Sequence, residues 1–215
     1  MSGKDDQYAR QACAWTERSY ADAASYLAHR AELVVALGPR LEPGDQVLDL
    51  ACGDGGFGEA LLRHGLRYRG VDATPEMVAE ASYRLGERAS VEVGDLNDYV
   101  PPGPVTATTV FRAVYYARDR RSFFRHVAEF TERKLVFDLN PRQYRVEDVL
   151  ADLRAAGLER VELRPFFVPQ TVALPRPLLA AARALERSES LARLALRHRF
   201  TYVVAASHER GETWR

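Results

Sequence analysis

The stretch VLDLACGDGGFGEALL, from Val47 to Leu62, contains the pattern that decides the fold. A short apolar run ends around the acidic Asp49, glycines follow, and a helical pattern then begins. The glycines are Gly53, Gly55, Gly56 and Gly58. Such a run is typical of a buried strand. Glycines after it let a ligand approach the backbone closely, and the free N–H groups at the start of the following helix favour anions. We therefore expect a strand-to-helix turn that either binds a ligand or is simply tight.

Strand and helix patterns alternate along most of the chain. We expect strands at 45–51, 67–73, 90–96, 105–115, 134–140, 159–168 and 199–207. Helical patterns occupy the first forty residues and most of the segments between the strands. Alternating strands and helices predict a parallel sheet, and the two late strands predict an antiparallel pair. The expected fold class is α/β, with a doubly wound, mostly parallel seven-stranded sheet, helices on both faces and an antiparallel late strand.

The chain length and the order of these patterns indicate one domain. The 215 residues are ample for one apolar core and few for two. We expect a single domain over 1–215, with an N-terminal helical cap over 1–40. Its core is expected over 41–165 and 200–210, and a helical lid insertion over 166–199.

Composition and charge argue against several classes of protein. The 30 basic and 30 acidic residues cancel, which gives no sign of nucleic acid as the main partner. The two cysteines, Cys13 and Cys52, have neither a metal-binding spacing nor a disulfide framework. No segment reaches the ~18 apolar residues that span a membrane, and the charged start MSGKDDQYAR lacks a signal-peptide core. We therefore expect a cytoplasmic protein without a metal site.

An acid at the end of the second expected strand indicates a nucleoside site at the glycine turn. Asp72 lies 19 residues after Gly53, and an acid about 20 residues beyond such a turn hydrogen-bonds ribose hydroxyls. The turn is not a P-loop, because no Gly-Lys-Ser/Thr sequence is present. Asp49 before the turn and Asp54 inside it are a poor lining for a pyrophosphate. They suit a cationic ligand that carries an ammonium and a sulfonium.

The combination of motifs resembles one enzyme family. VLDLACGDGG matches the first motif of class I S-adenosylmethionine-dependent methyltransferases, RGVDATPEMV resembles their ribose-binding strand end, and VEVGDLND resembles the segment beside their adenine. The order and spacing of these motifs run through roughly residues 45–145. The resemblance implies a Rossmann-like methyltransferase with S-adenosyl-L-methionine as its cofactor and S-adenosyl-L-homocysteine as the product.

The resemblance also assigns cofactor roles to individual residues. It implies that Asp72 holds the ribose, Asp95 takes the adenine amino group, and Asp49 orients the methionine amino group through water. Tyr20 or Tyr26 either closes over the methionine end or packs in the core. The small residues of the turn offer backbone to the methionine part, and apolar residues pack on the adenosine. The expected cofactor-binding residues are Tyr20, Asp49, Ala51, Cys52, Gly53, Gly55, Asp72, Ala73, Met77, Asp95, Leu96, Phe111 and Arg112.

The acceptor side of the expected cleft has a weaker signature. After the fourth strand the chain has FRAVYY, where amino methyltransferases of nucleic acids carry Asn/Asp-Pro-Pro-Tyr, and this difference disfavours such a substrate. Tyr115, Tyr116 and Asn140 are the candidate catalytic residues, since they follow strands whose ends face the cleft. They can orient an acceptor or help to remove its proton. Asp138 and Arg142 follow the fifth strand with Asn140. Packing or loop hydrogen bonding is the alternative role for each residue.

The segment between the last two strands contains two short helical patterns in which arginine outnumbers glutamate. It is either a helical flap packed on the sheet or a lid over a bulky apolar acceptor. In the second interpretation, residues 174–199 also make a peripheral membrane contact. Phe166, Phe167 and Gln170 lie at the start of this segment and are candidates to line the acceptor pocket.

Three functions remain open from the sequence. The first is methyl transfer to a small-molecule acceptor, lipophilic or natural-product-like, by direct in-line displacement in a monomer or homodimer. The second is a non-catalytic S-adenosylmethionine-binding or interaction protein, and the third is an RNA or protein methyltransferase. An acceptor-sized cavity beside Tyr115 and Asn140 favours the first function. A cleft filled by the late helices favours the second, and a continuous basic groove favours the third.

Overall fold

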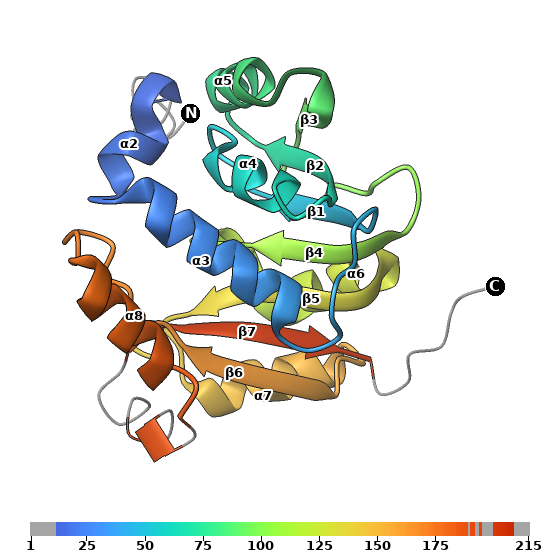
Figure 1. The fold of residues 1–215 in the computed structure, drawn as a ribbon. Helices are drawn as coiled ribbons and strands as arrows, with labels where there is room; N and C mark the ends of the chain where they lie inside the picture. The colour runs from blue at the N-terminus through green and yellow to red at the C-terminus, as the bar shows by residue number, and fades with distance from the viewer. Residues whose placement is uncertain (1–11, 189, 192–193, 195–199, 209–215) are drawn as a thin grey trace.

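Seven strands form one sheet in the order β3-β2-β1-β4-β5-β7-β6 (Figure 1). The computed structural model describes residues 12–188, 190–191, 194 and 200–208. The strands are β1 (Gln46–Leu50), β2 (Arg67–Asp72), β3 (Ala89–Val93), β4 (Val105–Val110), β5 (Thr131–Leu139), β6 (Arg160–Pro165) and β7 (Tyr202–Ser207). β7 runs antiparallel to both of its neighbours, and the other pairs are parallel. The expected fold class is confirmed.

Helices cover both faces of this sheet. The helices are α2 (Trp15–Ser19), α3 (Ala23–Ala36), α4 (Gly56–Leu62), α5 (Pro75–Leu85), α6 (Arg120–Phe130), α7 (Val146–Ala155) and α8 (Arg176–Leu185). Short 3-10 turns are η1 (Ala12–Ala14), η2 (Gly86–Arg88) and η3 (Val114–Tyr116). Figure 1 shows α3, α4 and α5 in front of the sheet, and α6 and α7 behind it. α2 and α8 lie beside the carboxyl ends of the parallel strands, at the left of the view.

The strand order reverses between β1 and β4. From β1 the chain continues outward through β2 to β3, and it then returns to β4 on the other side of β1. Ligands of open α/β sheets bind outside the carboxyl ends of the strands at such a switch point. A ligand site is therefore expected among the loops that follow β1, β2 and β4.

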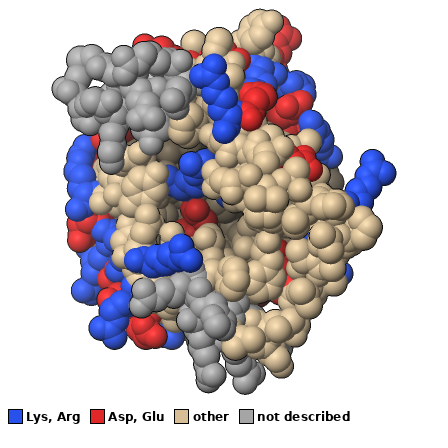
Figure 2. All heavy atoms as spheres, turned by 90° about the vertical axis from the view of Figure 1, so that its left-hand side faces the viewer, with Lys and Arg blue, Asp and Glu red and all other residues tan. Residues whose placement is uncertain are grey.

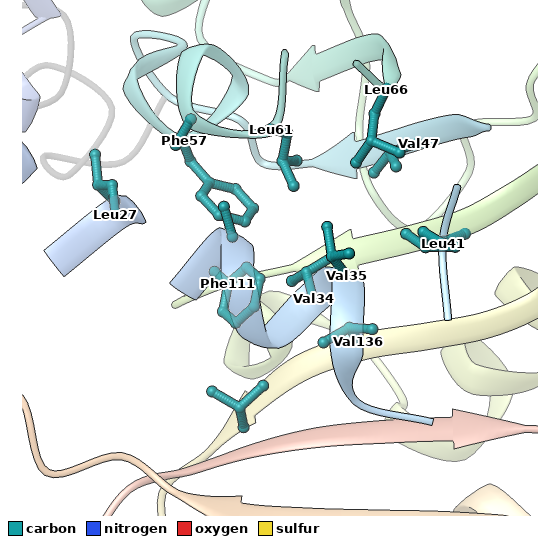
Figure 3. Close-up of a cluster of buried hydrophobic side chains, with 14 of the residues drawn as sticks. Leu27, Val34, Val35, Leu41, Val47, Phe57, Leu61, Leu66, Phe111 and Val136 are labelled. Carbon is teal, nitrogen blue, oxygen red and sulfur yellow. The ribbon is translucent and has the colours of Figure 1, made fainter. Parts of the chain in front are cut away.

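Each face of the sheet has its own apolar core. On the side of α3 and α4, one apolar face of α3 is buried, including Leu27, Ala31 and Val34. Figure 3 shows Phe57 at the start of α4 and Phe111 after β4 approaching each other across this core. Their ring centroids are 5.1 Å apart in an edge-to-face arrangement, which is a preferred geometry of aromatic pairs. This core reaches the strand ends and supports the floor of the site.

A buried lysine closes the carboxyl end of α3. The Nζ of Lys134 on β5 donates to the carbonyl oxygens of Leu37 at 2.7 Å and Val35 at 3.3 Å. The last carbonyls of a helix lack partners within the helix, so a cation there satisfies them and interacts favourably with the helix dipole. Burial nevertheless lowers the pKa of Lys134 to about 7. The contact fixes α3 on the sheet at the end remote from the site.

The expected strands are present with shifted ends. The fourth ends at Val110 rather than at residue 115, because residues 114–116 form η3. The fifth begins at Thr131 rather than at residue 134, because Thr131 pairs with Val105 before an irregularity in the register. Of the two helices expected in the insertion, α8 is present, and the second falls mainly on residues outside the described part of the chain.

Hydrogen bonds attach the insertion to the N-terminal segment and α3. The side-chain Nε2 of Gln170 donates to the carbonyl of Ser19 at 2.9 Å, and the N–H of Ala21 donates to the carbonyl of Gln170 at 2.9 Å. Glu186, at the end of α8, is buried and forms a hydrogen bond with His29 of α3. Within the described ranges, no helix is long and apolar enough to cross a membrane.

Candidate active site

A cavity of about 480 Å³ lies over the strand ends at the β1–β4 switch. The N-terminal segment supplies one wall, and the loops after β1, β2, β3 and β4 supply the rest. The cavity-lining residues are Trp15, Thr16, Tyr20, Leu27, Arg30, Asp49, Ala51, Cys52, Gly53, Asp54, Phe57, Asp72, Ala73, Thr74, Met77, Gly94, Asp95, Leu96, Asn97, Phe111, Arg112, Ala113, Tyr115, Tyr116 and Arg118. Figure 2 looks onto this face, where acidic and basic side chains border a hollow.

Asp72 is held at the end of β2 by two backbone groups. Its Oδ2 accepts a hydrogen bond from the N–H of Gly53 at 2.9 Å, and its Oδ1 accepts one from the N–H of Thr74 at 2.9 Å. Burial raises the pKa of this carboxyl group, and the two backbone hydrogen bonds oppose the rise. Each oxygen keeps a further lone pair, so the carboxylate can accept two ligand hydroxyls in a fixed orientation.

Asp49 is a second buried acid on the cavity wall. Its Oδ2 accepts from the Tyr68 hydroxyl and its Oδ1 from the Thr109 hydroxyl, both at 2.7 Å, and only 2% of the residue is exposed. Burial raises the pKa of Asp49 to about 6, against the two hydrogen bonds. A cationic ligand group beside it would restore the charged form.

The glycines of the turn serve packing more than ligand access. A Cβ on Gly56 would lie 2.3 Å from the Thr16 hydroxyl, and a Cβ on Gly58 would lie 2.5 Å from the Tyr68 ring. Gly55 has a positive φ of 78° and faces Ala81 of α5, with 3.0 Å left for a Cβ. Of the four, only Gly53 lines the cavity. The missing bulk therefore lets α2, β2 and α5 approach the turn.

The carboxylate of Asp54 is bound by Thr16 and by Arg84. Its carboxylate accepts two hydrogen bonds from Thr16 and one from Arg84 at 3.0 Å. Because Arg84 neutralises this charge, Asp54 cannot be counted as a free acid facing the ligand. Asp49 is then the main acid of the cavity wall that disfavours a pyrophosphate.

Asp95 lies at the far end of the cavity, after β3. It accepts hydrogen bonds from the backbone and side chain of Asn97 and from Arg118 at 2.8 Å. Partial burial raises the pKa of Asp95, but the hydrogen bonds from Asn97 and the nearby Arg118 lower it overall. Leu96 and Met77 line the same end and are buried, which gives this end an apolar wall with an acid at its edge.

Arg30 brings a buried positive charge to the opposite end of the cavity. This residue of α3 is only 4% exposed, and its Nη2 donates to the Tyr26 hydroxyl at 3.0 Å. Its guanidinium lies 4.3 Å from the centroid of the Phe111 ring, and its Nε has no hydrogen-bond partner. Among the described residues, no carboxylate forms an ion pair with it, although Asp138 lies close enough to favour its charge.

Arg112 follows β4 in an unusual backbone conformation. Its φ is 56°, and its N–H donates to Oδ1 of Asp138 at 2.7 Å. The guanidinium lies over the rings of Trp15 and Tyr20, at 5.6 Å and 5.8 Å from their centroids. Its Nη1 is buried without a hydrogen-bond partner. Two guanidinium groups therefore line the cavity with unsatisfied donors.

Sequence comparison identifies the segment that builds most of this cavity. Residues 47–134 match a family model described as methyltransferase domain. This segment is a methyltransferase domain. An uncharacterised methyltransferase of Schizosaccharomyces pombe is 34% identical over 89 residues, a match that covers 41% of this chain and 30% of that protein. The match therefore spans less than a third of the curated relative.

Two solved structures share this fold over nearly the whole chain. A proposed Haloferax volcanii methyltransferase, solved in complex with the Trm112 methyltransferase activator, has a TM-score of 0.67 and 21% identity, covering 95% of this chain and 98% of that one. Phosphoethanolamine N-methyltransferase 2 of Haemonchus contortus, solved with S-adenosyl-L-methionine, has a TM-score of 0.65 and 15% identity, covering 96% of this chain and 57% of that one. At these identities the likeness establishes the fold, and the expected class I methyltransferase fold is confirmed.

The methyltransferase domain places most expected site residues together. Every expected cofactor-binding residue except Gly55 lines the cavity, and so do Tyr115 and Tyr116. Asn140 does not line it, because its side chain accepts from the N–H of Arg142 and caps the turn after β5. Phe166, Phe167 and Gln170 also lie outside the lining.

The sequence indicated Tyr20 as the contribution of the N-terminal helices to the cavity, but not Trp15, Thr16 or Arg30. Trp15 and Thr16 line the cavity through contacts with residues far away in the sequence, which no local pattern reveals. Arg30 did leave a signal. It lies three residues after Leu27 and four before Val34, on the apolar face of α3. An arginine in an apolar stripe indicates a buried cation that requires a partner.

Proposed function

We propose that the methyltransferase domain binds S-adenosyl-L-methionine and transfers its methyl group to a small-molecule acceptor. The observation that carries the proposal is the pairing of Asp72 with the N–H of Gly53 inside an open cavity. It joins the glycine turn to an acid preset for two hydroxyls, which is the arrangement a ribose requires. The remaining charged groups of the cavity then match the rest of the cofactor.

The methionine end of the cofactor carries an ammonium and a carboxylate, and the cavity offers a partner for each. Asp49 is buried beside the glycine turn and can accept from the ammonium. Arg30 is a buried guanidinium with an unsatisfied Nε, and a carboxylate is the anion that such a group binds well. Uncompensated buried charges are costly, so the bound amino-acid group would stabilise both side chains.

The adenosine would extend toward β3. Asp95 can accept from the adenine amino group, while Met77 and Leu96 form an apolar wall for the ring. Asp95 already binds Asn97 and Arg118, so the amino group would share the carboxylate with these partners. This placement leaves the sulfonium near Phe111, Arg112 and the two tyrosines of η3.

The reaction would be a direct displacement. An acceptor lone pair forms the new bond to the methyl carbon as the carbon–sulfur bond breaks. The electron pair of the broken bond returns to sulfur. S-Adenosyl-L-homocysteine leaves, and a proton on the acceptor atom passes to a base or to solvent. Orientation alone can supply about 7–11 kcal/mol of such a barrier, so a wall that fixes the acceptor in line contributes much of the rate. Tyr115 and Tyr116 line the cavity and are the candidates for this wall.

The cavity supports a small acceptor over the two alternatives. In the described part of the insertion, no residue of α8 lines it, so this helix does not fill the cleft, and a filled cleft would favour a non-catalytic binder. Its volume of about 480 Å³ is in the range of small-molecule sites, and the proposed cofactor would occupy part of it. Both acids and arginines line it, which differs from a continuous basic groove for RNA. A cytoplasmic location and a monomeric or homodimeric state remain part of the proposal.

We also propose that residues 174–199 of the insertion make a peripheral contact with a membrane. α8 has no buried residue, and Leu178 and Leu185 are exposed on it beside its arginines. An exposed apolar face with basic neighbours is the composition of helices that lie on membrane surfaces.

Calorimetry with S-adenosyl-L-homocysteine tests the cofactor part of the proposal. We expect one binding site per chain, and incubation with methyl-labelled S-adenosyl-L-methionine and a panel of small acceptors should then yield a labelled product. Absence of binding to the wild-type protein would overturn the proposed function. Binding without transfer to any small acceptor, but with transfer to RNA or protein, would support the third alternative.

A further inference from the structure

The cavity holds two guanidinium groups with unsatisfied buried donors, but the proposed cofactor has one carboxylate. Arg30 approaches the cavity from α3 and Arg112 from the end of β4. In the described part of the chain, neither forms an ion pair with a carboxylate, and each retains a buried nitrogen without a hydrogen-bond partner. Once the cofactor carboxylate has bound Arg30, the second guanidinium still lacks an anion.

Arg112 is held in place by backbone and by aromatic rings. A φ of 56° is rare for a residue with a side chain, because the left-handed region brings Cβ close to the backbone. The hydrogen bond from its N–H to Asp138 stabilises this conformation. Trp15 and Tyr20 then lie beside the guanidinium and limit its movement. Such strain is typical of functional sites, and here it directs a long side chain along the cavity wall.

Arg112 lines the cavity at the end of β4, on the β4 side of β1. It follows Phe111, and Ala113, Tyr115 and Tyr116 continue the same wall. The two tyrosines are 44% and 38% exposed, and the carbonyl of Tyr116 accepts a hydrogen bond from Nδ2 of Asn97 at 3.3 Å, so η3 also borders the loop after β3. Asp72 and Asp95, which we assign to the adenosine, follow β2 and β3 on the other side of β1.

We propose that the side chain of Arg112 binds an acidic group on the acceptor, so that the substrates of this methyltransferase are small organic acids. The inference rests on the proposed function and adds the chemical class of its acceptor. A guanidinium binds a carboxylate or a phosphate through parallel hydrogen bonds, and such pairs fix orientation as well as affinity. The backbone of Arg112 keeps its expected place beside the cofactor, while its side chain orients the acceptor for in-line attack.

Matched probes on the product-saturated protein test this subsite. Calorimetry is performed with excess S-adenosyl-L-homocysteine, and phenylacetate, phenyl phosphate and phenylacetamide are titrated in turn. We expect at least one of the two acids to bind more tightly than the neutral amide by about tenfold or more. The stronger acid identifies the anion as a carboxylate or a phosphate. Equal binding of both acids and the amide, or binding of none, would overturn the acid subsite.

Variants of Arg112 distinguish binding of the acid by its side chain from an effect on cofactor binding and from a general effect of charge. Arg112→Met should weaken the preferred acid about tenfold and leave the amide and S-adenosyl-L-homocysteine within about twofold. Arg112→Lys should recover part of the acid affinity, because it restores the charge without the planar fork. Arg125→Met on α6 is the matched control, since Arg125 is exposed and outside the cavity. Loss of S-adenosyl-L-homocysteine affinity in Arg112→Met would overturn the proposal and assign Arg112 to the cofactor carboxylate.

The failure of this inference is distinguishable from the failure of the proposed function. If the wild-type protein does not bind S-adenosyl-L-homocysteine, the proposed function fails and the acid subsite fails with it. If the cofactor product binds normally but the acids bind no better than the amide, only the acid subsite fails. A thermal unfolding curve of Arg112→Met that matches the wild type ensures that a change in binding reflects the side chain.

Discussion

Thr16 donates two hydrogen bonds to the carboxylate of Asp54, one from its backbone N–H and one from its hydroxyl. The two residues are 38 positions apart, and the contact attaches α2 to the glycine turn. Gly56 makes the approach possible, since any Cβ there would collide with the Thr16 hydroxyl. Arg84 of α5 completes the cluster by pairing with Asp54. The wall of the cavity and the turn below it are therefore one connected structure.

Thr16→Val tests whether this contact holds the N-terminal wall. Valine keeps the shape and the backbone hydrogen bond but removes the hydroxyl donor from a buried carboxylate. The free energy of unfolding should fall by about 1–3 kcal/mol in urea denaturation. S-Adenosyl-L-homocysteine should also bind more weakly, because Trp15 and Thr16 line the cavity. The exposed Thr171→Val is the control. If Thr16→Val matched that control in both measurements, the wall would not depend on the contact.

Arg30→Met tests the partner of the cofactor carboxylate. The affinity for S-adenosyl-L-homocysteine should fall by about tenfold or more, since the lost hydrogen bonds are charge-assisted. 5′-Methylthioadenosine has the same adenosine and sulfur but lacks the amino-acid group, so its affinity should change by less than about twofold. Calorimetry with both ligands measures the difference. An equal loss for the two ligands would mean that Arg30 shapes the cavity without binding the carboxylate.

Asp49 predicts a pH dependence of cofactor binding. Burial raises the pKa of this carboxyl group from 3.8 to about 6, so in the free protein it becomes protonated as the pH falls through 6. The ammonium of the ligand requires the ionised form. The affinity for S-adenosyl-L-homocysteine should therefore rise with pH below 6, by up to about tenfold per unit, and level off above it. Asp49→Asn should bind more weakly at pH 7 and show a flatter profile. A wild-type affinity that is constant from pH 5 to 7 would contradict this role.

Lys134 predicts a pH dependence of stability that does not involve the site. Burial lowers its pKa from 10.5 to about 7, so between these values the unfolded chain binds more protons than the folded chain. Stability should rise with pH across this window, by up to about 1.4 kcal/mol per unit, and the gain should be lost as pH falls toward 7. Lys134→Met should remove this component of the slope in urea denaturation at several pH values. An unchanged slope would show that Lys134 keeps its charge on the carbonyls of α3.

The sequence predicts well what depends on local patterns. Strand-to-helix alternation indicated the sheet, and the spacing from Gly53 to Asp72 indicated a pair that the structure joins by a hydrogen bond. The purpose of the glycines was only partly predictable, because the partners of Gly56 and Gly58 are side chains from other segments. A sequence shows that bulk is missing at a turn, but it does not show what occupies the space.

The parts of the site that escaped prediction depend on contacts that are distant in sequence. Asn140 follows a strand that ends at the right edge of the sheet, yet its side chain turns back to cap its own loop. Nothing in the local pattern separates this outcome from a side chain that enters the cavity. The α2 wall likewise depends on Asp54, which the sequence presented as a ligand-facing acid and the structure pairs with Thr16 and Arg84.

Binding of S-adenosyl-L-homocysteine and 5′-methylthioadenosine to Asp72→Ala tests the central claim most directly, since both ligands contain the ribose. The variant removes the acceptor proposed for the two hydroxyls, and Asp148→Ala, an exposed acid on α7, is the control. We predict that Asp72→Ala, confirmed as folded by its unfolding curve, binds both ligands at least about 30-fold more weakly than the wild type, while the control binds both normally. Unchanged affinity of the folded Asp72→Ala variant for both ligands would contradict the assignment of this cavity to the cofactor.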